Sequence, residues 1–440
     1  MNAFFTALNS YLWGFPMIAF LLFTHLFFTA KTGFVQKKLL KAIKLSLKGE
    51  SSDKNISPFQ ALCTTLASTL GTGNIIGIGT AISLGGAGAL FWCFITGILG
   101  MATMYCESSL AVKYRIRTPD GKFAGGPMYY MKNGAGSEYL ALFYAVVAAT
   151  GGLITGAALQ GNAISTALHG FLNAPKSDST FELSGMTISV GLIAAILTAL
   201  VIMGGVKSVG SVCQVLVPFM AIAYMLACMG IIIVNRRYLA KALCLIFESA
   251  FTPQAAAGGF TGSTIMTACR FGMARGLFSN ESGVGTTSVV SAASEGDNRR
   301  NISLVTMTAA FWDTAVVCTA TGIAIITAML ANPAIAADTP GDMLASLAFD
   351  TLPIVGRPVL FFGLVTFAFS TIIGWSYIGE RCAEFVLGFN GIKVYRLLWI
   401  AAVAVSAAIN SELIWSIADT INVLIVLPNV TTLFILRKEI

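Results

Sequence analysis

The sequence predicts an all-α polytopic membrane protein, and three observations lead to this fold class. Hydrophobic residues make up 56% of the 440 residues and charged residues only 11%, whereas soluble proteins carry about 25% charged residues. The mean hydropathy is +0.79. The apolar residues gather in runs of roughly 20 residues, the length that crosses a bilayer as a helix. We therefore expect a single transmembrane domain over residues 1–440, embedded in the lipid bilayer.

Eleven apolar runs follow one another along the chain, and we interpret each as one transmembrane helix. The seventh run is the least regular, because Pro253 and three glycines interrupt it. The runs cover residues 12–30, 57–85, 87–112, 140–170, 186–204, 212–234, 243–270, 302–331, 357–380, 394–410 and 412–436. The polar stretches 31–56, 113–139 and 271–301 are expected to be cytoplasmic loops.

The basic residues predict the orientation. Seven lysines follow the first run, between residues 31 and 54, and short lysine-rich loops stay in the cytoplasm. We expect a multi-pass protein of the plasma (inner) membrane, with its N-terminus outside and its C-terminus in the cytoplasm. This sorting also accounts for the net charge of +7, so the charge does not indicate a nucleic-acid partner.

The run at 57–85 contains a predicted break. Gly71, Thr72, Gly73 and Asn74 lie in its middle, and the run carries no charge. Unpaired backbone groups at bilayer depth cost several kcal/mol, so an unwound stretch persists only where it lines a cavity or is shielded by protein. Its carbonyls fit a small cation and its helix N-terminus fits a carboxylate. Close helix packing through Gly73 and Gly77 is the alternative, but the amide of Asn74 favours a binding role.

A second flexible point is expected in the run at 243–270. Packing is a strong alternative there, because glycine is common in membrane helices. Two breaks in runs of opposite direction are typical of an inverted repeat, with the substrate between them. We expect repeats over 57–236 and 237–440, after an extra N-terminal helix and cytoplasmic loop in 1–56. The residues of the second point are Gly258, Gly259, Phe260, Gly262 and Ser263.

Polar side chains in two other runs complete the candidate site. The hydroxyls of Ser370 and Thr371 can supply hard oxygen ligands for Na⁺, and Thr371 shares a helix face with Trp375. Bonding of such hydroxyls to their own helix is the alternative. In the run at 140–170, either Gln160 or Asn162 is expected to point inward, as a substrate contact or an interhelical hydrogen bond.

Carboxylates within apolar runs are functional candidates by default. Glu107 and Asp313 could titrate in a proton-coupled transporter, which is one alternative function; an ion channel is another. Pairing with Arg381 or Arg115, or helix capping, is the expected role of most such carboxylates, including Glu380. The sequence contains no recognisable group of acid, base and nucleophile, so we do not expect an enzyme.

Blocks along nearly the whole chain resemble the alanine or glycine:cation symporters, also called sodium:alanine symporters. The blocks occur in the same order as in that family. They are SPFQAL (57–62), GTGNIIG (71–77), FWC (91–93), GGPMYYM (125–131), RGLFSNESGVG (275–285), FWDT (311–314), FAFSTIIGWSYIGERCAE (367–384) and IADTINVLIVLPN (417–429).

The resemblance implies a leucine-transporter-like core of five plus five helices behind one N-terminal helix. It also implies Na⁺-coupled uptake of alanine or glycine by alternating access, with Na⁺ as the coupling ion. The substrate would meet Thr72, Gly73, Asn74, Gln160, the glycine-rich seventh run (Gly259, Phe260, Gly262, Ser263), Thr371 and Trp375. Na⁺ would bind the carbonyls of Ala67 and Leu70 and the hydroxyls of Ser370 and Thr371. Residues 285–294 depart from the family pattern, which puts substrate range and gating in question.

Overall fold

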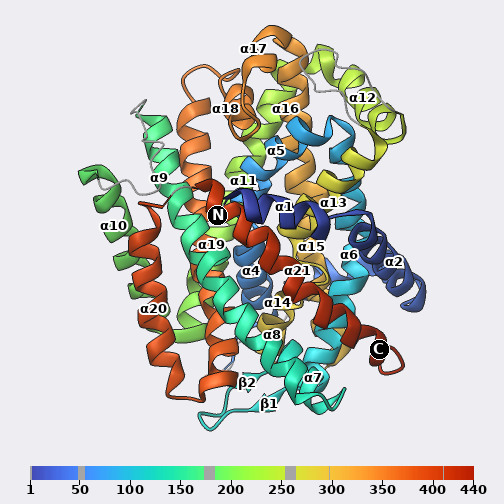
Figure 1. Cartoon of the computed structure of the whole chain (residues 1–440), viewed down its shortest axis with the longest axis vertical. Coiled ribbons are helices and arrows are strands. Elements are labelled where there is room, and N and C mark those ends of the chain that lie inside the picture. Colours follow the sequence, from blue (N-terminus) through green and yellow to red (C-terminus); the bar gives the residue numbers. More distant parts are fainter. Residues whose placement is uncertain (1, 48–54, 173–183, 253–263, 297, 410) are drawn as a thin grey trace.

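The computed structural model describes residues 2–47, 55–172, 184–252, 264–296, 298–409 and 411–440. Helices make up nearly all of this part of the chain (Figure 1). Its one named sheet is a hairpin of β1 (Ile116–Arg117) and β2 (Phe123–Ala124), paired antiparallel with Ile116 opposite Ala124. The fold is therefore all-α, as the composition predicts.

Seven helices in the described residues are long and apolar enough to cross a membrane, and the bent pair Phe15–Lys31 and Val35–Ser46 could form an eighth. Two of the seven contain a π-helical turn. The seven are α6 (Gly88–Lys113), α8–η3–α9 (Glu138–Gly151, Gly152–Ala158, Leu159–Phe171), α10 (Gly185–Ile202), α11 (Gly205–Val234), α15–η5–α16 (Arg299–Ala310, Phe311–Cys318, Thr319–Ala331), α19 (Gly356–Leu387) and α21 (Ser411–Ile435).

The surface of these helices suits lipid. Leu200 of α10 and Phe219 and Leu226 of α11 are each more than two-thirds exposed, and a soluble protein rarely exposes such patches. The chain is a multi-pass membrane protein. The count of eleven spans stays a prediction, because α20 (Gly391–Ser406) and the interrupted helices described next are shorter.

The predicted break in the run at 57–85 is confirmed. Helix α4 (Pro58–Thr69) begins at a capping box between Ser57 and Gln60. The extended residues Leu70 and Gly71 and a single 3₁₀ turn, η2 (Thr72–Asn74), then separate α4 from α5 (Ile76–Gly85). Helix α4 lies near the centre of the molecule, and α5 lies above it, toward the end that carries α17 and α18 (Figure 1).

The predictions of one helix over residues 243–270 and of a loop over residues 271–301 are wrong. Helix α12 (Leu239–Phe251) ends and α13 (Ile265–Asn280) begins within the predicted run at 243–270, and the predicted break at Gly258–Ser263 lies outside the described residues. The structure has a break further on, at 281–285, before α14 (Thr286–Ala292). This segment belongs to the stretch expected as a cytoplasmic loop. It is instead buried, because α13 and α14 both pack against α6.

The remaining elements are short. The hairpin and α7 lie at one end of the molecule, and α12, α17 and α18 lie at the opposite end (Figure 1). These elements are α1 (Asn2–Leu12), α2 (Phe15–Lys31), η1 (Val35–Lys38), α3 (Leu39–Ser46), α7 (Pro127–Asn133), η4 (Arg236–Tyr238), α17 (Pro333–Asp338), η6 (Gly341–Met343) and α18 (Leu344–Phe349).

Candidate functional site

The two breaks meet at a small enclosed cavity in the middle of the helix bundle. Its volume is about 20 Å³, which suffices for a water molecule but is smaller than an amino acid. Residues from α4, η3, α9, α13, α19 and α21 and from both breaks line it: Ser68, Thr69, Gly71, Gly73, Thr155, Gln160, Leu277, Phe278, Glu281, Val284, Thr371, Trp375 and Asn422. Five chain segments far apart in sequence thus converge at one point.

The backbone of the first break is held by two amide side chains. The Gly71 N–H donates to Oδ1 of Asn74 at 2.9 Å. Gln160 accepts at Oε1 from the Thr72 hydroxyl at 3.2 Å and from the Thr72 N–H at 3.4 Å. Of the predicted pair, Gln160 faces the break, while Asn162 donates to the carbonyl of Ile409. Gln160 therefore fixes the unwound turn.

Asn74 turns away from this cavity toward a buried carboxylate. Its Nδ2 donates to Oδ1 of Asp313 at 2.7 Å and to the hydroxyl of Ser279 at 3.0 Å. The hydroxyls of Ser279 and Thr314 donate to the other carboxylate oxygen at 2.5 and 2.6 Å. Asp313 lies in the π-helix η5, a distortion that often occurs at functional sites. This cluster links the first break to α13 and to η5. Like the hydroxyls of α19 described next, it presents hard oxygen atoms.

The residues predicted to bind Na⁺ lie together. The hydroxyls of Thr371 and Ser370 donate to the Leu70 carbonyl, at 3.1 and 3.4 Å, and each also donates to the carbonyl of Phe367 at 2.9 Å. The close approach of α19 to α4 depends on Gly374, whose added Cβ would lie 2.7 Å from the Ser68 nitrogen. Oxygen atoms without thiolates or imidazoles suit a hard cation. The described residues contain no cluster of His, Cys, Asp and Glu that could hold a transition metal.

The second break carries a carboxylate that the sequence did not lead us to expect at the site. Glu281 ends α13 in the left-handed conformation, with φ of 58°, and lines the cavity. It accepts from the indole N–H of Trp375 at 2.8 Å and from the hydroxyl of Thr286 at 2.5 Å. Thr286 is the first residue of α14. In the sequence Glu281 stands before two closely spaced glycines, a composition that an exposed loop shares.

The backbone of the second break is held by side chains of α6, α8 and α21. Glu107 of α6 accepts at Oε1 from the Gly283 N–H at 2.9 Å and from Asn429 of α21 at 2.7 Å. Asn429 also donates to the Gly283 carbonyl at 2.8 Å, and Tyr144 donates to that of Val284 at 2.9 Å. Glu107 therefore has no arginine partner among these bonds. It holds the unwound chain instead.

A larger cavity of about 520 Å³ approaches the first break from the α5 end of the molecule. Thr72 lines this cavity, together with Thr80 of α5, Asn162 of α9 and Arg275 of α13. Arg275 lies 3.5 Å from Asp419 and 4.9 Å from the centre of the Trp415 ring. This cavity is a candidate entrance to the site.

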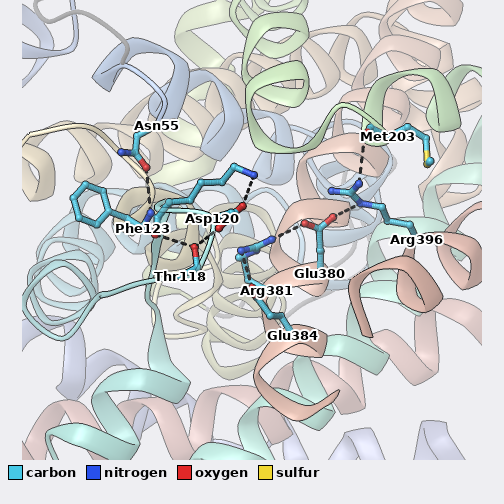
Figure 2. A network of polar contacts seen from close by, with 10 residues as sticks. Asn55, Thr118, Asp120, Phe123, Met203, Glu380, Arg381, Glu384 and Arg396 are labelled. Carbon is cyan, nitrogen blue, oxygen red and sulfur yellow. Dashed lines mark hydrogen bonds and ion pairs between the residues drawn. The ribbon is translucent and has the colours of Figure 1, made fainter. Parts of the chain in front are cut away.

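The hairpin end of the molecule is tied together by charged side chains (Figure 2). The carboxylates of Glu380 and Glu384 lie 2.7 and 2.6 Å from the guanidinium of Arg381, and Arg396 of α20 donates to Glu380 at 2.6 Å. This confirms the predicted pairing of Glu380 with Arg381. Arg115, next to the hairpin, donates to the carbonyls of Ser294 and Gly296, at 3.0 and 2.7 Å. The chain that follows α14 is therefore anchored at this end.

Comparisons with known proteins agree with the geometry. The model of the sodium:alanine symporter family matches residues 1–440. The sodium/alanine symporter AgcS of Methanococcus maripaludis is 40% identical over 97% of this chain and 93% of its own length. An uncharacterized transporter of Haemophilus influenzae is 41% identical over 99% of this chain and 93% of its own length. The crystal structure of MhsT in complex with L-phenylalanine superposes with a TM-score of 0.60 at 14% identity, covering 88% of this chain and 90% of that one. The likeness shows that the chain has the leucine-transporter-like fold.

Proposed function

Because this chain belongs to the sodium:alanine symporter family, we propose that it couples the uptake of small neutral amino acids, alanine or glycine, to the entry of Na⁺. The protein is a membrane transporter and not an enzyme. One observation carries the proposal: the Leu70 carbonyl and the hydroxyls of Ser370 and Thr371 converge beside the unwound turn that opens onto the cavity.

In this proposal Na⁺ binds the carbonyls of Ala67 and Leu70 and the two hydroxyls of α19. The substrate carboxylate docks at the N-terminal end of η2 and α5, where helix N–H groups favour an anion. Both ligands order the same residues, 67–74, so each raises the affinity for the other. A membrane potential adds about 2.3 kcal/mol per charge for every 100 mV to inward Na⁺ movement.

The substrate contacts proposed from the described residues are Thr72, Gly73, Gln160, Thr371 and Trp375, with Asn74 holding the turn. The indole of Trp375 and the ring of Phe278 wall the cavity, which favours small side chains. Gly259, Phe260, Gly262 and Ser263 lie outside the described residues and stay sequence predictions. The repeats 57–236 and 237–440, the outside N-terminus, the cytoplasmic C-terminus and the inner-membrane location belong to the same proposal.

The test is uptake of radiolabelled alanine into proteoliposomes with Na⁺ imposed on one side. Glycine, D-alanine and larger amino acids serve as competitors. Replacing Thr371 by Val removes one cation ligand, so the Na⁺ concentration for half-maximal uptake should rise about tenfold, whereas Thr371→Ser should stay near wild type. Unchanged Na⁺ dependence in Thr371→Val, or in a variant with an apolar residue at Asn74, would refute the site assignment.

Proton coupling is the second candidate, and Asp313 is the observation that favours it. This buried carboxylate bonds to Asn74, Ser279 and Thr314, and within the described residues it forms no ion pair with a basic side chain. Uptake that persists without Na⁺ and collapses with a protonophore would support it. A channel is less favoured because the cavity at the two breaks is small. Currents that reverse with ion gradients in the absence of amino acid would support one.

A further inference from the structure

We propose that the carboxylate of Glu281 is the counter-charge for the ammonium group of the amino-acid substrate. The inference rests on the proposed function and assigns a residue that the sequence did not single out. Glu281 lines the central cavity and is only 5% exposed. Trp375 lines the same cavity, so the carboxylate and the indole that it binds form one wall.

The carboxylate is hydrogen-bonded but its charge is not paired. Both partners that it has, the Trp375 indole and the Thr286 hydroxyl, are neutral donors. Among the described residues, no Lys, Arg or His side chain forms an ion pair with Glu281. A buried charge is costly unless it is paired, and a carboxylate inside a membrane domain is by default a functional group. A cation that enters the cavity, such as the ammonium group of a substrate, can therefore pair with this carboxylate.

The carboxylate has capacity for a further donor. Each of its oxygens has two lone pairs, and each accepts one hydrogen bond, from Trp375 at Oε1 and from Thr286 at Oε2. These two bonds also fix the orientation of the carboxyl group. An ammonium group has three N–H donors, so it can bond to one or both oxygens without displacing either existing partner.

The helix ends around the cavity match a zwitterion. Helix α13 ends at Glu281, whose N–H donates to the Leu277 carbonyl at 2.9 Å, so the negative end of this helix dipole adds to the carboxylate. Gly71 and Gly73, on the cavity wall of the first break, lie at the start of η2 and α5, which is a positive helix end. A molecule with a carboxylate at the first break and an ammonium at the second satisfies both.

This arrangement predicts which ligands are recognised. An α-amino acid has both charges, whereas lactate has the same carbon skeleton as alanine with a hydroxyl in place of the ammonium. The site should prefer alanine strongly. N-acyl amino acids should be rejected as well, since they lack the cation and are too large for a cavity walled by Trp375.

The test compares alanine with lactate on the purified full-length protein in saturating Na⁺, using the concentration of each that gives half-maximal thermal stabilisation. Glu281→Gln keeps the shape and removes the charge. It should weaken alanine binding about ten- to hundredfold and leave lactate binding nearly unchanged, so the preference falls by the same factor. Glu248→Gln is the matched control: it makes the same change at an exposed carboxylate of α12, away from the cavity, and should keep the preference.

Other outcomes overturn the assignment. Equal weakening of alanine and lactate in Glu281→Gln means a structural role, and a loss of Na⁺ affinity with the preference intact means a cation ligand. Glu281→Asp keeps the charge and serves as the test if Glu281→Gln does not fold. Its preference for alanine over lactate should stay within about threefold of wild type. A larger loss of that preference overturns the proposal. If the wild-type protein binds alanine and Glu281→Gln keeps the preference, this inference alone fails. If the wild type binds no amino acid, the proposed function fails with it.

Discussion

Gly374 is the position at which one methyl group should separate the two helices that form the proposed Na⁺ site. In Gly374→Ala the new Cβ would lie 2.7 Å from the Ser68 nitrogen and 3.0 Å from the Ala67 carbonyl carbon. An ordinary contact needs about 3.4 Å, and both neighbours are backbone, so α19 and α4 must part by about 0.7 Å. The same shift takes the 3.1 Å bond from Thr371 to the Leu70 carbonyl to about 3.8 Å, beyond hydrogen-bond distance.

Two effects follow from this shift. Overpacking costs about 1–3 kcal/mol of stability, and the convergence of hydroxyls on the Leu70 carbonyl is lost. Loss of an interaction with a charged ligand is worth about 1.5–3 kcal/mol, so the Na⁺ concentration for half-maximal alanine uptake should rise at least about tenfold.

The assay is alanine uptake into proteoliposomes over a range of Na⁺ concentrations, with the amount of folded protein measured in parallel. Gly170→Ala is the control, because Gly170 lies in helix α9 and an added Cβ there meets nothing within 4 Å. A Gly374→Ala protein that folds and shows wild-type Na⁺ activation would refute the placement of the cation between α4 and α19.

Two predictions concern the hairpin end of the molecule. Arg381→Gln leaves the nearly buried Glu384 without its cation, whereas Glu380 keeps Arg396. A loss of about 3–5 kcal/mol should appear as a lower melting temperature. Arg357→Gln, at an exposed pair, should melt like wild type. For Asp120, burial raises the pKa, but the hydrogen bonds from Lys122 and Thr118 outweigh it and lower the pKa to about 2. A lowered pKa in the folded state gives stability that is present above the unfolded pKa of about 4 and is lost below it. The melting temperature of Asp120→Asn should therefore approach that of wild type as the pH falls from about 4 toward 2, and a constant difference would contradict this.

Local composition was enough to predict much of the fold and half of the site. The all-α membrane fold follows from the length of the apolar runs, since a charge-free segment of this length has few other stable states. The break at Gly71–Asn74 was predictable for the same reason: glycine and a buried amide in a charge-free run are a local signal. Thr371 and Trp375 were found through helical spacing, and both line the cavity.

The second break was not predictable in this way, and neither was Glu281. The residues 279–285 contain Ser, Asn, Glu and Gly, a composition that a solvent-exposed loop and a buried unwound turn share. What distinguishes the two is whether partners satisfy the polar groups, and these partners come from elsewhere in the chain: Glu107, Asn429 and Trp375.

The sequence by itself thus determined that the chain crosses a membrane, to which family it belongs and that the run at 57–85 is broken at Gly71–Asn74. Only the tertiary structure decided that the second break lies at residues 281–285 and that the carboxylate of Glu281 faces the cavity. The physical reason is that the cost of a buried polar group depends on its bonding partners, and packing, not local sequence, brings those partners together.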